Sequence, residues 1–393
     1  MINKLQEMAF LVVLLLAALA QAQTFTVLHN FTGSPDGGYP SGVIQHPVGK
    51  LYGTTTYGGG QNCFPFGCGV IFEVSTAGRE TVLHSFSGSP DGSWPWGPVI
   101  WDDTGNFYGT AGEGGAYSCA GVGCGIVFRV DTTGKETILY NFTGGSDGCY
   151  PAQGLIRDRS GIFYGTTFGC GSSDAGTIFK IDPAGKFTLL HSFAGSDGAG
   201  PWGGHMILDH WGNLYGITQY GGTDKCGTLY RLSENRTFTV LHTFAGGTSD
   251  GCAPWGSVVR DKAGNLYGTA SEGGFTGNGT IWKVSKTGEE TILHNFAGGS
   301  SDGCRPVAGV VRDSQGNLYG VAMGCGAYGY GALYELKTEG GLTLLHSFDD
   351  RDGDQPASEV WRTAKGELFG TSELGGDRNC SGDACGTVWS YVP

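Results

Sequence analysis

The stretch Gly264-Asn265-Leu266-Tyr267-Gly268-Thr269 recurs, with small changes, seven times along a chain of 393 residues. The aromatic residue of this motif stands at Tyr52, Tyr108, Tyr164, Tyr215, Tyr267, Tyr319 and Phe369. Successive copies are therefore 50 to 56 residues apart. Self-similarity with a period of this size is typical of proteins built from stacked or radially arranged repeats.

Each period contains four short segments, which we name a, b, c and d. In the fifth copy they are residues 256–261, 265–270, 279–284 and 290–296. They are six or seven residues long, rich in Val, Ile, Thr and aromatic residues, and bounded by Gly, Asp and Asn, which predicts β-strands. Glycine-containing tight turns join a to b and c to d, as expected for antiparallel hairpins.

Four antiparallel strands in each of seven periods predict an all-β fold, a seven-bladed β-propeller. The two ends of the chain support this prediction. Residues 24–31 form a d segment without its own a, b and c, and residues 386–391 form a c segment without a d. Pairing the N-terminal strand into the last blade would close the ring and remove the exposed sheet edges. A linear β-solenoid, the alternative, does not need such complementary ends. We expect residues 23–393 to be one domain.

Residues 1–22 have the pattern of a secretory signal peptide. Lys4 makes the start weakly basic, residues 10–20 are apolar, and Ala20-Gln21-Ala22 fits a signal-peptidase site. The apolar run is shorter than the roughly 20 residues that a membrane-spanning helix needs. We expect cleavage after Ala22 and a secreted or periplasmic protein without membrane attachment.

Twelve cysteines fit an exported protein, and their spacing predicts six disulfides. The predicted pairs are Cys63/Cys68, Cys119/Cys124 and Cys380/Cys385, each five apart, Cys149/Cys170 and Cys304/Cys325, each 21 apart, and the remaining Cys226 and Cys252. Zinc binding is the alternative, but the paired cysteines lack clustered partners and export favours oxidation. We therefore expect neither a metal nor a cofactor.

In an up-and-down blade, the d–a and b–c connections emerge on one face. All twelve cysteines lie in or beside these connections, and we call this face the stapled face.

The charge balance and the motifs exclude several classes of function. The net charge is −13 with only 15% charged residues, so neither nucleic acid nor an anionic membrane is an expected partner. The sequence has no nucleophile elbow, P-loop, dinucleotide fingerprint or His-Glu-x-x-His motif. This absence favours a non-enzymatic function.

The recurring pattern GNLYGTT…GG…GTIFKV…G…TxLHxF…DG resembles the GloVer tandem repeats of exported bacterial proteins of the "choice-of-anchor" type. The resemblance covers essentially all of the chain after residue 22. It implies a secreted or surface repeat protein, expected to be a propeller, and it supplies no catalytic residues. Members commonly carry a C-terminal anchoring signal. The sequence printed here has no Leu-Pro-x-Thr-Gly motif or apolar tail, so we expect release rather than covalent anchoring.

Two polar residues recur with the repeat. An Asp-Gly pair occurs in every d–a connection, at Asp36, Asp91, Asp147, Asp197, Asp250, Asp302 and Asp352. Six of the seven d segments carry a histidine, at His29, His84, His191, His242, His294 and His346, with Tyr140 in the seventh. The aspartates could hold Ca²⁺ or sugar hydroxyls, but we favour Asx-turns because a Ca²⁺ loop needs more oxygen ligands. Histidines on different outer strands lie too far apart to share an ion, so we expect a hydrogen-bonding position between blades.

Residues that break the repeat indicate function better, because the fold does not require them in every blade. The residue after the d–a proline is Ser41, Trp96, Ala152, Trp202, Trp255, Val307 or Ala357. These positions begin the innermost strands, so Trp96, Trp202 and Trp255 are predicted to line one mouth of the central channel. Indole faces suit sugar rings or apolar ligands, while packing inside the channel is the alternative. Further candidate binding residues on or before a segments are Trp94, His205 and Glu359.

We therefore expect an exported, monomeric, non-catalytic binding module whose favoured ligand is a glycan or polysaccharide. A carbohydrate-active enzyme, hydrolase or lyase, is the alternative, and a protein-interaction scaffold with a protein partner is the third. A glycosidase needs two carboxyl groups at a set separation. The candidate carboxyl groups are those of Glu113, Glu272, Glu359 and Glu373. Several b–c loops begin with an aromatic residue or an acid that could provide polar contacts, namely Tyr57, Glu113, Tyr220, Glu272 and Glu373.

Overall fold

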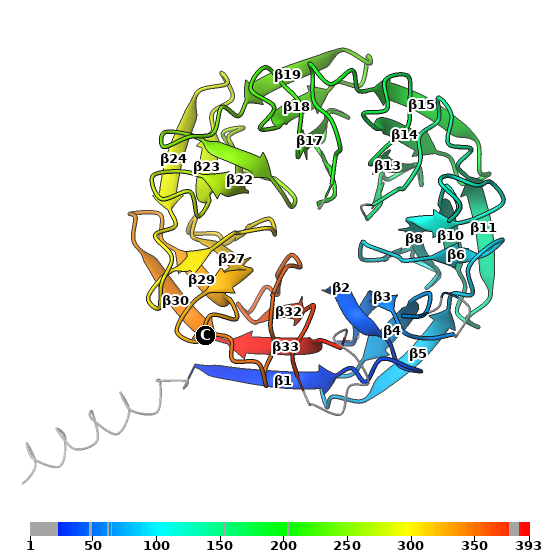
Figure 1. The fold of residues 1–393 in the computed structure, drawn as a ribbon, viewed down its shortest axis with the longest axis horizontal. Helices are drawn as coiled ribbons and strands as arrows, with labels where there is room; N and C mark the ends of the chain where they lie inside the picture. The colour runs from blue at the N-terminus through cyan, green and yellow to red at the C-terminus, as the bar shows by residue number, and fades with distance from the viewer. Residues whose placement is uncertain are drawn as a thin grey trace, which may run out of the picture.

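The computed structural model describes residues 23–46, 49–60, 63, 65–152, 154–202, 204–376 and 385–393. Its strands form seven small antiparallel sheets arranged in a ring around a central axis (Figure 1). The predicted seven-bladed propeller is therefore confirmed. In the part of the chain that the structure describes, no helix is long and apolar enough to cross a membrane.

Each blade contains the predicted a, b, c and d segments, in this order from the axis outward (Figure 1). The strands are, in blade 1, β2 (Gly38–Gln45), β3 (Leu51–Tyr57), β4 (Val70–Val74) and β5 (Glu80–Ser85); in blade 2, β7 (Ile100–Trp101), β8 (Phe107–Ala111), β10 (Ile126–Val130) and β11 (Glu136–Asn141); in blade 3, β12 (Ile156–Arg157), β13 (Phe163–Thr167), β14 (Thr177–Ile181) and β15 (Phe187–Ser192); in blade 4, β16 (Ile207–Leu208), β17 (Leu214–Thr218), β18 (Thr228–Leu232) and β19 (Phe238–Thr243). They are, in blade 5, β21 (Val259–Arg260), β22 (Leu266–Gly273), β23 (Thr280–Val284) and β24 (Glu290–Asn295); in blade 6, β26 (Val311–Arg312), β27 (Leu318–Ala322), β29 (Ala332–Leu336) and β30 (Leu342–Ser347); in blade 7, β31 (Trp361–Arg362), β32 (Leu368–Ser372), β33 (Thr387–Val392) and β1 (Thr24–Asn30). Short ladders link the stapled-face loops, formed by β20 (Gly251–Pro254) with β22, β6 (Gly92–Ser93) with β9 (Glu113–Gly114), and β25 (Gly303–Cys304) with β28 (Gly324–Cys325).

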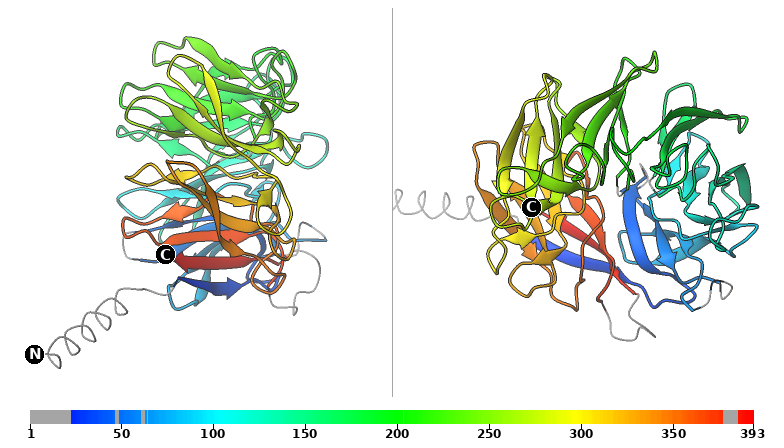
Figure 2. Two further views of the ribbon diagram at one scale, coloured as in Figure 1. Left: turned by 90° about the vertical axis from the view of Figure 1, so that its left-hand side faces the viewer. Right: turned by 45° about the horizontal axis from the view of Figure 1, so that its top comes forward.

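Strands from the two ends of the described chain complete the last blade together. Strand β1 pairs antiparallel with β33, with Thr24 opposite Val392 and Asn30 opposite Thr387. The two strands lie side by side in Figure 1 and in the nearly edge-on view of Figure 2. This pairing confirms the predicted ring closure, and it covers the edge that β33 would otherwise expose.

The recurring LYGT motif is explained by two local contacts. The Tyr267 hydroxyl donates a 3.0 Å hydrogen bond to the carboxylate of Asp261, which also accepts the backbone N–H of Asn265 at 2.9 Å. The next residue, Gly268, lies under the fully buried Trp282 ring of the c strand, where a Cβ atom would come within 2.4 Å. The motif therefore secures the a–b turn and leaves room for the c-strand aromatic residue.

One aromatic pair at each blade interface joins neighbouring sheets. The phenylalanine that ends a d segment packs against the c-strand aromatic residue of the next blade, with ring centroids 5.0 to 5.6 Å apart. The pairs are Phe31–Phe72, Phe86–Phe128, Phe142–Phe179, Phe193–Tyr230, Phe244–Trp282, Phe296–Tyr334 and Phe348–Trp389. Such pairs contribute about 0.5–1.5 kcal/mol each beyond the burial of their area.

The a strands are shorter than predicted. They span two residues in six blades, and only β2 of blade 1 is long. Around the axis the inner backbones of neighbouring blades touch, because a Cβ on Gly204 would lie 1.9 Å from Gly256 and one on Gly256 would lie 2.0 Å from Gly309. This part of each a segment packs against the next blade and does not pair within its own sheet. Only the end of the a segment therefore pairs with the b strand.

The recurring Asp-Gly pairs are local turns, as predicted. Asp36, for example, accepts the backbone N–H of Thr32 at 3.1 Å. Three of the recurring histidines hydrogen-bond to the aspartate of their own d–a connection, namely His191 to Asp197, His294 to Asp302 and His346 to Asp352. The contact with the next blade varies. His191 stacks on Phe238 at 3.8 Å between ring centroids, whereas His84 Nδ1 lies 3.3 Å from the Gly134 carbonyl of the next blade, which is the expected hydrogen bond between blades.

Five of the six predicted disulfides are formed within the described residues. They are Cys63–Cys68, Cys119–Cys124, Cys149–Cys170, Cys226–Cys252 and Cys304–Cys325. The sixth predicted pair, Cys380 with Cys385, is only half described. Cys385 is buried directly before β33 and is disulfide-bonded, whereas Cys380 lies outside the described residues. The pairing of Cys385 with Cys380 therefore stays a prediction.

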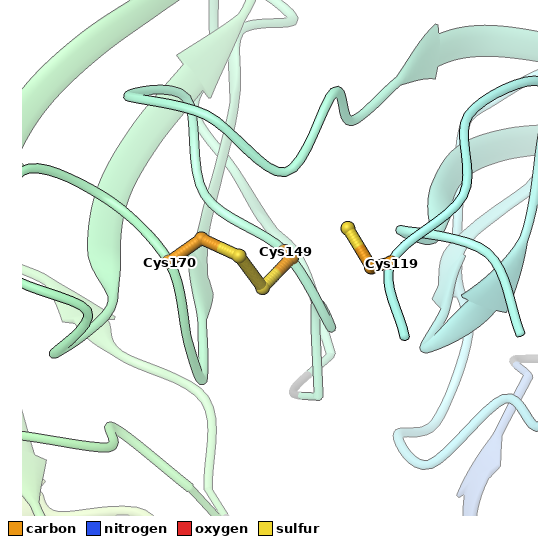
Figure 3. Close-up of side chains that lie close together, drawn as sticks. All are labelled: Cys119, Cys149 and Cys170. Carbon is orange, nitrogen blue, oxygen red and sulfur yellow. A yellow bond between two sulfur atoms is a disulfide. The ribbon is translucent and has the colours of Figure 1, made fainter. Parts of the chain in front are cut away.

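Three of the described cysteines come together near the boundary of blades 2 and 3. Figure 3 shows the Cys119 sulfur beside the Cys149–Cys170 bridge, within 4.8 Å of both sulfurs. All three atoms already belong to disulfides, so this group is a covalent staple rather than a metal site. The disulfides indicate an oxidising compartment, extracellular or periplasmic.

Candidate functional site

A cavity of about 870 Å³ lies at the centre of the ring, and all seven blades contribute to its lining. It extends from the d–a connections of the stapled face, where Tyr39, Trp94 and Arg305 line it, to the a strands, where Val311 and Trp361 do. Its position follows from the propeller geometry, because the innermost strands of the blades surround the axis.

Two rings of variable side chains form much of the lining. The first consists of the seven residues that follow the d–a proline, all of which line the cavity, namely Ser41, Trp96, Ala152, Trp202, Trp255, Val307 and Ala357. The second is the residue that directly follows the b segment, four residues after the recurring aromatic, and it differs in every copy of the repeat. Five of these residues line the cavity, namely Thr56, Phe168, Gln219, Met323 and Glu373. The repeat thus keeps its framework constant and varies the residues around the cavity.

Aromatic side chains from three blades meet on one side of the cavity. The Trp96 and Trp202 rings lie with centroids 4.9 Å apart, and Phe168 contacts Trp202 edge-on at 4.8 Å. Trp94 lies 6.3 Å from Trp96, and its indole N–H donates to the carbonyl of Gly67 at 3.3 Å. All four predicted tryptophans, including Trp255, are half-buried and line the cavity. Their rings therefore keep surface that a ligand can contact.

A polar group joins blades 4, 5 and 7 beside the same cavity. The buried hydroxyl of Ser257 donates to Glu359 Oε2 at 2.8 Å and lies 3.1 Å from His205 Nδ1. His205 Nδ1 and Glu359 Oε2 are 3.4 Å apart. The structure thus brings the two predicted residues, His205 and Glu359, together through a serine that the sequence analysis missed. The same imidazole nitrogen faces both partners, so the group lacks the serine–histidine–acid relay of a hydrolase, in which the two nitrogens have separate partners.

The acidic candidates of the b–c loops separate into two positions. Glu373 lines the cavity, whereas Glu113 and Glu272 do not. Glu113 pairs with Ser93, and the exposed Glu272 pairs with Cys252. In blade 7 the equivalent position is that of Leu374, which pairs with Asp354. Grouping Glu373 with the other two acids was therefore wrong by one residue, whereas Tyr57 and Tyr220, which share the register of Glu113, do line the cavity. Burial raises the pKa of Glu373 to about 7, although the Tyr39 hydroxyl hydrogen-bonds to its carboxyl.

The family model of the Gloeobacter/Verrucomicrobia repeat matches residues 15–167, 120–309 and 259–393. The chain belongs to this repeat family. The family identified from the sequence resemblance is thus confirmed. No curated protein matches the sequence.

Solved propellers share the fold of this Gloeobacter/Verrucomicrobia repeat protein at low sequence identity. Two are extracellular domains from B. thetaiotaomicron, assigned to a hybrid two-component system and to a one-component system, with TM-scores of 0.54 and 0.56 and identities of 13% and 9%. The alignments cover 93% and 94% of this chain but 41% and 40% of those chains. A gluconolactonase from Xanthomonas campestris has a TM-score of 0.44 at 13% identity, covering 94% of this chain and 99% of its own. The similarity to the two extracellular domains shows the fold alone.

In this repeat protein, the residue before each d–a proline has an unusual backbone conformation. Its φ angle lies between 52° and 60° in every blade, at Tyr39, Trp94, Tyr150, Gly200, Ala253, Arg305 and Gln355. Only one of the seven is glycine, and other residues are costly in this left-handed region, by about 1–3 kcal/mol each. Such strain concentrates at functional sites. Here it surrounds the mouth of the cavity.

Besides Ser257, which supports His205 and Glu359 but does not itself line the cavity, the sequence analysis missed several lining residues. Trp361 stands on β31, where the other six copies of the repeat have Ile or Val, so its departure from the repeat was visible in the sequence. The variable residue directly after the b segment, represented by Phe168 and Gln219, was a second detectable pattern. Ser257 offered no such pattern, because its importance arises from contacts across the ring.

Proposed function

We propose that this protein binds carbohydrate, without catalysis, in the central cavity. The observation that carries the proposal is that one cavity is lined both by the Trp96–Trp202 pair and by His205 and Glu359, which the buried hydroxyl of Ser257 joins. The ligand in this proposal is a segment of a glycan or polysaccharide outside the cytoplasm.

The chemistry of sugars supports this choice of ligand. A pyranose ring has C–H faces that pack on indole rings and hydroxyl groups that need hydrogen-bond partners. The cavity offers half-buried indoles together with carboxylate, imidazole and amide groups, the last from Gln219. Its volume of about 870 Å³ falls within the range of small-molecule sites, roughly 300–1,000 Å³.

The test is a glycan and polysaccharide panel with the oxidised chain from residue 23, followed by calorimetry on each hit. Trp96→Ala and Trp202→Ala are expected to weaken binding at least tenfold. Trp211→Ala is the matched control, because Trp211 is 57% exposed on an a–b turn and does not line the cavity. No reducing ends should be released. An affinity that is unchanged in both Trp96→Ala and Trp202→Ala would refute the proposal. A panel in which no glycan binds would favour a protein-interaction scaffold.

A glycoside hydrolase is the second candidate, because two carboxyl groups of different character line the cavity. Burial raises the pKa of Glu373 to about 7, whereas Glu359 accepts a hydrogen bond from Ser257. Hydrolases use such a contrast to keep one carboxyl protonated and the other ionised. Release of reducing ends that disappears in both Glu359→Gln and Glu373→Gln would replace the binding proposal with this one.

A further inference from the structure

The blade interfaces differ at one position, the residue near the start of each d strand. This residue faces the recurring histidine, or Tyr140, of the preceding blade. At three interfaces it is Phe and stacks on that ring, in the pairs Phe25–His346, Phe187–Tyr140 and Phe238–His191. At three others it is Glu, at Glu80, Glu136 and Glu290. The glutamates thus bring a carboxylate to a place where the fold otherwise accepts an aromatic ring.

At two of these interfaces the glutamate completes a group of three metal-ligand side chains. One ligand atom each from His84, Asp91 and Glu136 lies within 4.8 Å of the others, and the same holds for His242, Asp250 and Glu290. In the second group, His242 Nε2 lies 3.5 Å from Asp250 and 3.7 Å from Glu290. The interface of Glu80 has the same residue types, but its ligand atoms are not all within 4.8 Å.

Both groups contain buried polar atoms without a hydrogen-bond partner. These atoms are His84 Nε2, Glu136 Oε1, His242 Nε2 and Glu290 Oε1. Buried polar atoms are normally hydrogen-bonded, so these unsatisfied atoms, which recur as His29 Nε2 and Glu80 Oε1 at the third glutamate interface, require an explanation. They are also the atom types that coordinate metals.

The surroundings of His84 orient it as a metal ligand. Its Nδ1 lies 3.3 Å from the carbonyl of Gly134, which allows Nδ1–H to donate there and leaves the Nε2 lone pair directed at the carboxylates. Metal-binding histidines commonly have this second hydrogen bond. Asp91 is held in place by the backbone N–H and hydroxyl of Ser87, at 2.9 and 2.8 Å.

We propose that each of these two interfaces binds one divalent transition-metal cation through an imidazole Nε2 and two carboxylates. One nitrogen and two oxygen ligands suit Zn²⁺ and its neighbours in the first transition row. Ca²⁺ would need six to eight oxygen ligands. The cation would join neighbouring blades, because two ligands come from one blade and its d–a connection and the glutamate comes from the next blade.

The sequence analysis excluded a metal because histidines of different blades are too far apart to share one. The structure gathers the ligands around a single histidine instead, from its own d–a connection and the adjacent d strand.

The test is a calorimetric titration of the chelator-treated chain from residue 23 with Zn²⁺. We expect two equivalents to bind and the unfolding temperature to rise, because a ligand that binds the folded state stabilises it. Glu136→Gln/Glu290→Gln should lose both equivalents. Glu136→Phe/Glu290→Phe should also lose them while remaining folded, because Phe occupies the same position at three other interfaces. His205→Ala, which alters only the cavity, should retain both equivalents.

Two results would overturn the proposal. One is the absence of Zn²⁺ uptake by the unsubstituted chain. The other is an unchanged stoichiometry in Glu136→Gln/Glu290→Gln, which would place the ions elsewhere. Circular dichroism of each variant separates loss of ligands from loss of fold.

Discussion

The indole rings of Trp96 and Trp202 contact each other at 4.9 Å between centroids, although the residues belong to blades 2 and 4. Blade 3, which lies between them, carries the small Ala152 at the same position of the repeat. A larger side chain there would occupy the central space that the two rings share. The pair therefore depends on which residue each of three blades places after its proline.

The hydrogen bonds of Glu359 should matter for ligand affinity. Glu359→Gln is expected to weaken glycan binding about tenfold by removing the charge. Ser257→Ala is expected to weaken it about fivefold, since one net hydrogen bond contributes about 1 kcal/mol. Calorimetry with a hit from the glycan panel measures both effects. Glu272→Gln is the control, because Glu272 is exposed outside the cavity. An affinity of Glu359→Gln equal to that of the unsubstituted protein would contradict this prediction.

Stability should depend on pH through Glu373. Burial raises its pKa from 4.5 to about 7, so the folded state holds the proton more tightly than the unfolded state. Its contribution to stability is therefore complete below about pH 4.5 and is lost as the pH rises to about 7. The unfolding temperature, measured across this range, should fall less steeply in Glu373→Gln. If the unfolding temperatures of the two proteins change equally with pH, the Glu373 carboxyl does not contribute to the pH dependence of stability.

The substitution Gly268→Ala, which adds a methyl group, should destabilise the fifth blade. A Cβ there would lie 2.4 Å from the buried Trp282 ring, and overpacking of this kind costs about 1–3 kcal/mol. Urea unfolding measures the loss. Gly145→Ala is the control, because its Cβ would come no closer than 3.4 Å to any neighbour and should change stability by less than about 0.5 kcal/mol. Equal stabilities of the two variants would be inconsistent with this account of the motif.

The disulfides should contribute unequally to stability. Cys149–Cys170 closes a sequence separation of 21, whereas Cys63–Cys68 closes one of 5. Loop-closure entropy in the unfolded chain increases with loop length, so removing the longer staple should cost about 1 kcal/mol more. Paired substitutions to serine, compared by urea unfolding, test this difference. A greater loss on removing Cys63–Cys68 would indicate that strain or packing outweighs chain entropy.

Much of the fold could be predicted from the sequence because its determinants are local and recur seven times. The spacing of Tyr267 and its equivalents indicated the number of blades, and the complementary segments at residues 24–31 and 386–391 indicated the closure. The length of the a strands could not be predicted, since it depends on contacts such as Gly204 with Gly256 that exist only when seven blades surround one axis.

The order of residues along the chain was enough to specify the seven blades, their strand order, the closure and the tryptophans that depart from the repeat. Which of these departures meet became clear only in the folded ring. Ser257 reaches Glu359 across 102 residues, and Glu136 reaches His84 across a blade interface. The folded ring also showed that Glu373 lines the cavity and Glu113, which stands one residue further along in the register of the repeat, does not. The sequence determines the structure of each blade through local motifs that recur seven times. The contacts between blades depend on how the seven sheets pack around the axis.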